Sequence, residues 1–410
     1  MTESEHVAVV HDAAEVVVGP GRDAPLERHE DAAVAAVDGA VAAVGPTDEV
    51  TRAYPPENAT VAVDAAGRSV VPGFVDSHTH ALFAGDRADE FEAKLRGRSY
   101  QEILAEGGGI LRTVRSTREA DAPTLLGNLL GHLDTMLAHG TTTVEVKSGY
   151  GLDVETELRM LDVVAAADAR HPVDVVPTFM GAHAVPDEAD TDDYVERILT
   201  DQLPAVAEQG VAEFCDVFCE EGVFSVAQSR RVLEAGRERG LAPKVHAEEF
   251  TRLGGAQLAA DVDAASADHL LHATDADAAA LADAGVTPVL LPGTAFSLGE
   301  SYADLRRLVD AGAPVAVATD FNPNCYSQSM PFAVALACVG MGATPAEALV
   351  AATRNGALAL DRPGGLGTLR EGAPADLLVL DAPSHVHVPY NFAVNVVDTV
   401  LKAGEVVHRD

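Results

Sequence analysis

The sequence predicts an α/β fold, a (β/α)8 TIM barrel with a small composite β-sandwich domain from the N- and C-terminal segments. Three observations predict it. Eight apolar runs recur through the middle of the chain, Ala- and Leu-rich stretches separate them, and both ends consist of short β-type segments. Near-continuous apolar runs are typical of parallel strands that are buried on both faces. Eight roughly even units over about 300 residues fit a closed barrel and disfavour a doubly wound open sheet.

The two ends of the chain have the same sequence pattern, short apolar runs separated by turn residues. Within residues 1–71, the segments EVVVGPG, AVDGAVAAVGP and TVAVDAAGRSVVPG are β-type runs broken by Gly, Pro and Asp. Residues 372–410 alternate apolar and turn residues in PADLLVLDAP and VVDTVLKAGEVV. Short apolar runs between turn residues read as strands. We therefore expect residues 1–71 and 372–410 to form one β-domain, with the barrel over residues 72–371.

The barrel strands are expected where apolar runs end in polar loops, with helices such as TELRMLDVVAAADA (156–169) between them. Runs bounded by turn residues, and too short for helices, favour strands. The eight candidates are SVVPGFVD (69–76), GTTTVEV (140–146), VDVVPTFM (173–180), EFCDVFC (213–219), APKVHA (242–247), SADHLL (266–271), TPVLLP (287–292) and APVAVAT (313–319).

Titratable side chains collect where these strands end. Because the carboxyl ends of barrel strands converge on one face, residues spread over about 240 positions become neighbours there. Histidines placed for structural reasons alone would be spread over helices and loops. In strand order the residues are His78 and His80, Lys147 and Tyr150, His183, Glu220 and Glu221, His246 and Glu249, His269 and His272, Thr294, and Asp320 and Asn322.

Four of these side chains form a candidate metal site. His78 and His80 are two apart, which puts both imidazoles on one side of an extended segment. With His246 and Asp320 they give three imidazoles and a carboxylate for one divalent metal, with room for a water. Asp320 and His269 are placed to take a proton from that water, and Glu249 can carry it to a leaving nitrogen. No lysine follows the fourth strand, which favours a single metal.

Composition excludes several classes of protein. The chain has 28 basic against 64 acidic residues, a formal charge of −36, which excludes nucleic-acid binding through phosphate contacts. It lacks an uninterrupted apolar stretch of about 18 residues and a basic, apolar N-terminal signal, so we expect a cytoplasmic protein without membrane contact. Four cysteines make no disulfide framework. An acidic chain with four lysines suggests a salt-rich cytoplasm, where surface repulsion is screened.

Several segments of the chain resemble a known family. PGFVDSHTH (72–80) with TD (319–320) resembles the metal-dependent amidohydrolase superfamily. More narrowly, the chain is similar to the imidazolonepropionases of histidine degradation over nearly its whole length. The similar segments are HALFAGDRADEFEAKLRGRSYQEILAEGGGI (80–110), TTVEVKSGYGL (142–152), TFMGAHAVP (178–186), KVHAEEF (244–250) and TDFNPN (319–324).

This resemblance implies an activity and a set of roles. The activity is hydrolysis of 4-imidazolone-5-propanoate, a small-molecule substrate, to N-formimino-L-glutamate, with one zinc or iron ion per subunit, in a homodimer. Catalysis is implied for Glu249, His269 and Asp320. The implied metal ligands are His78, His80, His246 and Asp320, and the implied substrate contacts are Arg87, which would pair with the propionate, Tyr150, His183, Glu249, Asn322, and the loop residues Asn324 and Cys325.

The last two positions depart from the family pattern, which usually has Gly followed by Ser or Thr after Asn-Pro. Asn324 tolerates a left-handed backbone better than most residues, so the turn can survive. Cys325 as a nucleophile is an alternative, although a metal-bound water would already supply one. Two other readings stay open: a ring aminohydrolase of purines, pyrimidines or triazines, which would have no need of Arg87, and a catalytically silent barrel, which would lose metal ligands.

Overall fold

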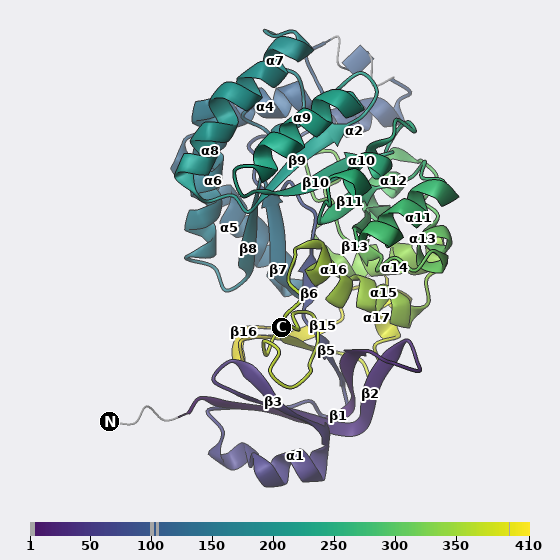
Figure 1. Cartoon of the computed structure of the whole chain (residues 1–410). Coiled ribbons are helices and arrows are strands. Elements are labelled where there is room, and N and C mark those ends of the chain that lie inside the picture. Colours follow the sequence, from purple (N-terminus) through teal and green to yellow (C-terminus); the bar gives the residue numbers. More distant parts are fainter. Residues whose placement is uncertain (1–4, 99–101, 104–105, 393) are drawn as a thin grey trace.

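The computed structural model describes residues 5–98, 102–103, 106–392 and 394–410. Figure 1 shows a barrel ringed by helices and, at one end of it, a sheet to which both terminal parts of the chain contribute. Within the family-like segment 80–110, residues 99–101 and 104–105 lie outside the described residues. Among the described helices, none has the length and apolarity needed to cross a membrane.

Eight parallel strands in the described chain form the barrel, and they follow one another around it in sequence order. The ring closes just beyond the first and last strands, where Thr79 pairs with Phe321. There the Asp320 N–H donates to the His78 carbonyl at 3.0 Å. The predicted barrel is confirmed, with strands β6 (Phe74–Asp76), β7 (Thr141–Lys147), β8 (Asp174–Ala182), β9 (Phe214–Cys219), β10 (Ala242–Ala247), β11 (Ser266–His269), β12 (Thr287–Leu290) and β13 (Ala316–Val317).

Helices cover the outside of the barrel, and side chains cap the beginnings of several of them. Asp153 accepts from the Thr156 N–H at 2.7 Å, and Ser225 forms a capping box with Gln228. The barrel helices are α2 (Ala88–Leu95), α4 (Ile110–Glu119), α5 (Ala122–Ala138), α6 (Val154–Asp168), α7 (Thr191–Arg197), η2 (Ile198–Gln202), α8 (Leu203–Gln209), α9 (Val226–Arg237), α10 (Gly255–Asp261), α11 (Asp275–Ala284), α12 (Pro292–Leu298), α13 (Leu305–Asp310), α14 (Met330–Met341), α15 (Pro345–Ala351) and α16 (Arg354–Ala359); α17 (His387–Tyr390) follows.

The terminal sheet combines strands from both ends of the chain, as predicted. Its order is β16-β15-β14-β5-β1-β2-β3, with β4 paired to β1, and its core includes Val16, Val34, Leu377 and Leu401. Its elements are β1 (Val7–Pro20), β2 (Leu26–Val37), β3 (Ala40–Pro46), α1 (Thr47–Ala53), η1 (Pro56–Asn58), β4 (Val61–Asp64), β5 (Ser69–Pro72), β14 (Leu377–Leu380), β15 (Val397–Lys402) and β16 (Glu405–Arg409).

The first predicted barrel strand, 69–76, divides at Gly73. Residues before it form β5 of the terminal sheet, and residues after it form β6 of the barrel. The Gly73 N–H donates to the Asp376 carbonyl at 2.9 Å, whereas the Phe74 N–H donates to Gly140 at 3.0 Å. A Cβ on Gly73 would lie 2.3 Å from Thr142 Oγ1 on β7, so the close approach of this segment to β7 requires glycine here.

A second connection between the two parts is made by Lys402 on β15. Its Nζ lies 2.7 Å from Asp376 Oδ2, next to β14, and 2.6 Å from Asp174 Oδ2, at the start of β8. The lysine side chain is 13% exposed. The terminal sheet is therefore joined to the barrel by an ion-paired lysine as well as by the chain at Gly73.

Candidate metal centre

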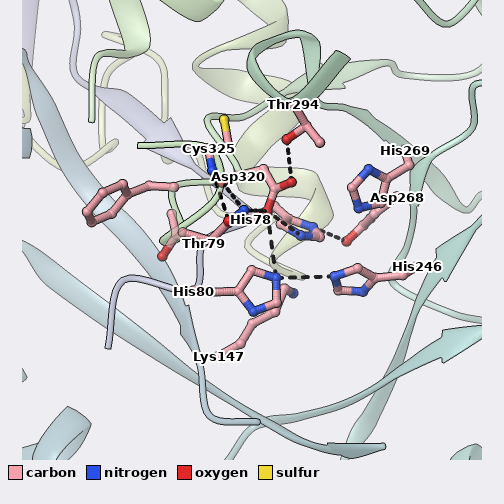
Figure 2. A network of polar contacts seen from close by, with 12 residues as sticks. His78, Thr79, His80, Lys147, His246, Asp268, His269, Thr294, Asp320 and Cys325 are labelled. Atoms are coloured by element: carbon pink, nitrogen blue, oxygen red, sulfur yellow. Dashed lines mark hydrogen bonds and ion pairs between the residues drawn. The ribbon is translucent and has the colours of Figure 1, made fainter. Parts of the chain in front are cut away.

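Three histidines meet at the carboxyl end of the barrel. His78 and His80 follow β6, and His246 lies in β10. All three are buried, and one ring nitrogen of each lies within 4.8 Å of a ring nitrogen of the other two. Their nearest ring nitrogens, Nε2 of His80 and Nε2 of His246, are 3.3 Å apart. Figure 2 shows the three imidazoles pointing toward a common centre.

Asp320, three residues after the end of β13, completes this group. Its Oδ1 lies 3.6 Å from His78 Nε2 and 3.7 Å from His80 Nε2. The residue has a φ of 49°, in the left-handed region that non-glycine residues rarely adopt. Hydrogen bonds hold its carboxylate: Thr294 Oγ1 donates to Oδ2 at 2.5 Å and Asn322 Nδ2 to Oδ1 at 3.1 Å. The structure thus brings the four predicted ligands together.

Two aspartates that the sequence analysis did not single out orient the histidine rings. His78 Nδ1 lies 2.6 Å from Asp268 Oδ2, and His246 Nδ1 lies 3.1 Å from Asp216 Oδ1. A carboxylate at Nδ1 keeps the proton on that nitrogen and leaves Nε2 free for a metal. Both aspartates lie inside apolar strands, in EFCDVFC and SADHLL, and a carboxylate in a buried strand is the signal that could have found them.

The polar groups around the centre fit a cation. His78 Nε2 is buried with no hydrogen-bond partner, although buried polar atoms are nearly always paired. Among the described residues of the cluster, the fully buried Lys147 pairs with Glu145 and Asp216 and the fully buried Lys244 pairs with Glu145, whereas the carboxylates of Asp268 and Asp320 form no ion pair with a lysine. A divalent cation would balance the formal excess of negative charge, which is otherwise costly to bury.

Glu249 and His269 lie beside this centre. His269 Nε2 is 3.6 Å from Glu249 Oε2, and the His269 ring is 5.2 Å from that of His246. Burial raises the pKa of Glu249 well above its ordinary value, and the negative charge of Asp320 raises it further. A carboxyl group in this setting holds its proton, which suits a proton donor.

Tyr150 and His183 form one wall of the site. The His183 ring stacks on that of His80 with centroids 4.7 Å apart, and it lies 5.2 Å from the Tyr150 ring. The loop that carries Tyr150 is held from below by Glu157, whose carboxylate accepts N–H groups from Gly149, Gly151 and Leu152 at 2.8–3.0 Å. Burial raises the pKa of Tyr150, so its hydroxyl stays protonated.

Arg87 is not an ordinary surface residue, since its side chain is 9% exposed. Its Nε donates to Glu90 Oε2 at 2.8 Å, and Glu90 Oε1 accepts the Gly109 N–H at 3.0 Å. The positive charge of Arg87 offsets part of the effect of burial on the pKa of Tyr150, which places the two side chains within electrostatic range. A guanidinium held in this way can pair with a carboxylate.

The loop after Asp320 is a compact turn built on Asn322. The Asn322 Oδ1 accepts the N–H groups of Asn324 at 2.8 Å and Cys325 at 3.0 Å. Asn324 Oδ1 accepts from Lys94 Nζ on α2 at 2.7 Å. The thiol of Cys325 is buried beside the Thr319 carbonyl, pointing away from the histidines in Figure 2, and burial raises its pKa to about 12. A protonated, inward-facing thiol does not support the nucleophile alternative.

Comparison with known proteins agrees with this geometry. The model of the amidohydrolase family matches residues 69–407. The imidazolonepropionase of Haloarcula marismortui is 73% identical over 98% of this chain and 96% of its own length. The chain belongs to the imidazolonepropionases of the amidohydrolase family. The imidazolonepropionase of Symbiobacterium thermophilum is 50% identical over 96% of each chain.

Solved structures of more distant proteins share the fold of this imidazolonepropionase family member. The crystal structure of an adenosine deaminase from Xanthomonas campestris with bound zinc superposes with a TM-score of 0.73 at 19% identity, covering 97% of this chain and 92% of that one. Membership confirms the predicted enzyme class, a hydrolase acting on carbon–nitrogen bonds. Membership in this enzyme family does not support the alternative of a catalytically silent barrel.

Proposed function

We propose that the chain hydrolyses 4-imidazolone-5-propanoate to N-formimino-L-glutamate. Water adds its hydroxyl to the ring carbonyl carbon, the bond from that carbon to the ring nitrogen breaks, and the nitrogen takes a proton. The observation that carries the proposal is the buried cluster of His78, His80, His246 and Asp320 at the mouth of the barrel. The 73% identity to a named imidazolonepropionase supports the choice of ring.

One zinc or iron ion is proposed as the occupant of this cluster, since imidazole and carboxylate ligands suit both metals. When bound, such an ion lowers the pKa of a coordinated water and polarises a carbonyl oxygen. The histidine rings are already fixed for that task, because Asp268 and Asp216 lie at the Nδ1 atoms of His78 and His246. The Asp320 carboxylate, held by Thr294, is placed to accept a proton from the attacking water.

Glu249 is proposed to protonate the leaving ring nitrogen. It is buried, and its carboxyl group holds a proton because burial and the charge of Asp320 raise its pKa. His269, 3.6 Å away, is its proposed partner in proton transfer. A proton delivered to the nitrogen as the bond breaks avoids an unstable anionic leaving group.

The remaining residues are proposed to position the substrate. Arg87 pairs with the propionate carboxylate, while Tyr150 and His183 contact the ring beside His80. Asn322 would contact the ring or product from the opposite loop. Asn324 and Cys325 act through the shape of that loop, because one side chain bonds Lys94 and the other faces inward.

The setting proposed for this activity is a salt-rich cytoplasm, in a homodimer. The formal charge of −36 and the four lysines support the first part. At molar salt the Debye length is about 3 Å, so surface carboxylates repel one another little. A lower melting temperature in dilute KCl than in molar KCl would agree with this setting, and sedimentation would give the oligomeric state.

The deciding experiment follows the loss of imidazolone propionate absorbance in molar KCl, with substrate generated in place by urocanase. Chelator-sensitive turnover that yields N-formimino-L-glutamate is the expected result. A folded, metal-loaded protein without turnover would contradict the proposal. Purine, pyrimidine and triazine substrates would then be tested, because a ring aminohydrolase would share the four ligands and Glu249.

A further inference from the structure

Two lysines are fully buried beneath the metal centre, and they have nearly the same surroundings. Lys147 ends β7, and Lys244 lies in β10. Both ammonium groups reach the same atom, Glu145 Oε1, at 2.7 Å from Lys147 and 3.1 Å from Lys244. Lys244 also donates to the Ser77 carbonyl at 2.9 Å. Both lysines therefore compensate the buried charge of Glu145.

Of the two lysines, Lys147 is the one that pairs with Asp216. Lys147 Nζ lies 2.8 Å from Asp216 Oδ2, and the other oxygen of that carboxylate, Oδ1, lies 3.1 Å from His246 Nδ1. The far nitrogen of the same ring faces the centre, 3.3 Å from His80 Nε2. Lys147, Asp216 and His246 thus form a continuous polar chain from a buried ammonium group to a metal ligand.

Lys147 is also tied to the other side of the centre through its backbone. Its N–H donates at 3.0 Å to the carbonyl of Thr79, the residue between the ligands His78 and His80. The residue therefore spans two ligand-bearing segments, one through its main chain and one through its side chain. Figure 2 shows Lys147 close to His80.

We propose that Lys147 is a positioning residue that acts through Asp216 to fix the ring of His246, and so sets the affinity of the centre for its metal. Asp216 orients the imidazole through Oδ1, and the ion pair of its second oxygen, Oδ2, with Lys147 restricts rotation of the carboxylate. The ammonium group of Lys147 holds that oxygen. The inference rests on the proposed metal centre.

The test compares two variants that remove the same buried charge. Lys147→Met and Lys244→Met each leave Glu145 with one ammonium partner, so a purely structural role predicts similar changes for both. Zinc affinity of the metal-free full-length protein is measured by competition with a chromophoric chelator in molar KCl. We expect Lys147→Met to weaken zinc binding about 10- to 100-fold, as is typical when a partner of a metal-ligating histidine is lost. Lys244→Met should lower thermal stability by a comparable amount but weaken zinc binding less than Lys147→Met does, because Lys244 pairs with Glu145 and Ser77 and not with Asp216.

Two further variants keep the test decisive if Lys147→Met does not fold. Asp216→Asn keeps the shape of the side chain but loses its charge, and it should weaken zinc binding to the same extent. Lys147→Arg, which restores a cation to the pocket, should recover part of the affinity. A Lys147→Met/Asp216→Asn double variant should bind zinc no more weakly than Asp216→Asn alone, since both changes break the same chain.

The outcomes separate this inference from the proposed function. Equal losses of zinc affinity in Lys147→Met and Lys244→Met, or additive losses in the double variant, would overturn the positioning role alone. Unchanged zinc affinity in Asp216→Asn would do the same. Wild-type protein that binds no zinc or iron would overturn the proposed metal centre, and this inference with it.

Discussion

The carboxyl end of the barrel and the core of the terminal sheet are both buried, but different chemistry fills them. Val, Ala and Leu fill the core of the terminal sheet, where the buried carboxylate of Glu15 pairs directly with Arg28 and His385. At the barrel end, His78, His80, His246 and their carboxylate neighbours meet instead. Burying charge is unfavourable unless it is paired, so a region that holds this many ionisable groups indicates a site for a cation and a reaction.

The largest expected effect comes from the barrel end. Asp320→Asn keeps the size of the side chain but removes the charge of the fourth ligand, so we expect loss of stoichiometric metal and a fall in kcat/KM on the order of a thousandfold or more. Metal analysis and steady-state kinetics measure both. Asp283→Asn, on the exposed side of α11, is the control and should change neither. Full metal content with normal turnover in Asp320→Asn would remove Asp320 from the centre.

Arg87→Ala tests whether the site extends to the loop before α2. A charge-assisted hydrogen bond is worth about 1.5–3 kcal/mol, so KM should rise roughly 10- to 100-fold while metal content stays constant. Arg96→Ala removes an arginine at the other end of α2 whose side chain is 74% exposed, and it should leave KM unchanged. An unaltered KM in Arg87→Ala would place the propionate elsewhere.

Gly73→Ala tests the joint between the two regions. The added Cβ would lie 2.3 Å from Thr142 Oγ1, and overpacking of this kind costs about 1–3 kcal/mol of unfolding free energy. Denaturant unfolding measures the loss, and a second change, Thr142→Ala, should recover part of it. Gly127→Ala on α5, with open space around it, should be neutral or stabilising. A Gly73→Ala protein as stable as wild type would show that the Gly73 segment and β7 can move apart there.

Glu15→Gln tests the buried charge of the terminal sheet, and it depends on pH. Glu15 accepts from His385 Nδ1 at 2.8 Å and Arg28 Nη1 at 2.7 Å. Burial alone would raise its pKa, but the hydrogen bonds outweigh burial and lower the pKa to about 2. Because the folded pKa lies below the ordinary 4.5, this stabilisation is complete above about pH 4.5 and is lost as the pH falls toward about 2.

We therefore expect Glu15→Gln to cost about 1–3 kcal/mol of unfolding free energy near neutral pH, with the difference from wild type shrinking in acid. Unfolding curves over a pH series at constant KCl measure it. Glu30→Gln, a carboxylate that is 74% exposed, should follow the wild-type curve. A difference that stays constant down to about pH 2 would contradict the assignment.

The comparison also shows what the sequence could predict. The positions of the barrel strands were predictable, because buried parallel strands are apolar. The meeting of His78, His246, His269 and Asp320 was predictable too, because the carboxyl ends of barrel strands converge on one face. Asp216 and Asp268 were hidden inside those same runs. The division at Gly73 depends on the approach of Thr142, and the Lys94–Asn324 contact joins residues 230 positions apart. Such pairings follow from tertiary geometry, which no local pattern encodes.

The lysines described above have a practical consequence for handling the protein. All four lie in the described part of the chain, and none is exposed: Lys147 and Lys244 are fully buried, and Lys94 and Lys402 are partly covered. Amine-directed reagents, including succinimidyl dyes and glutaraldehyde, will therefore find few targets on the folded molecule. Because the folded protein offers so few accessible amines, lysine acylation followed by mass spectrometry should be a sensitive measure of the fraction of molecules that have unfolded.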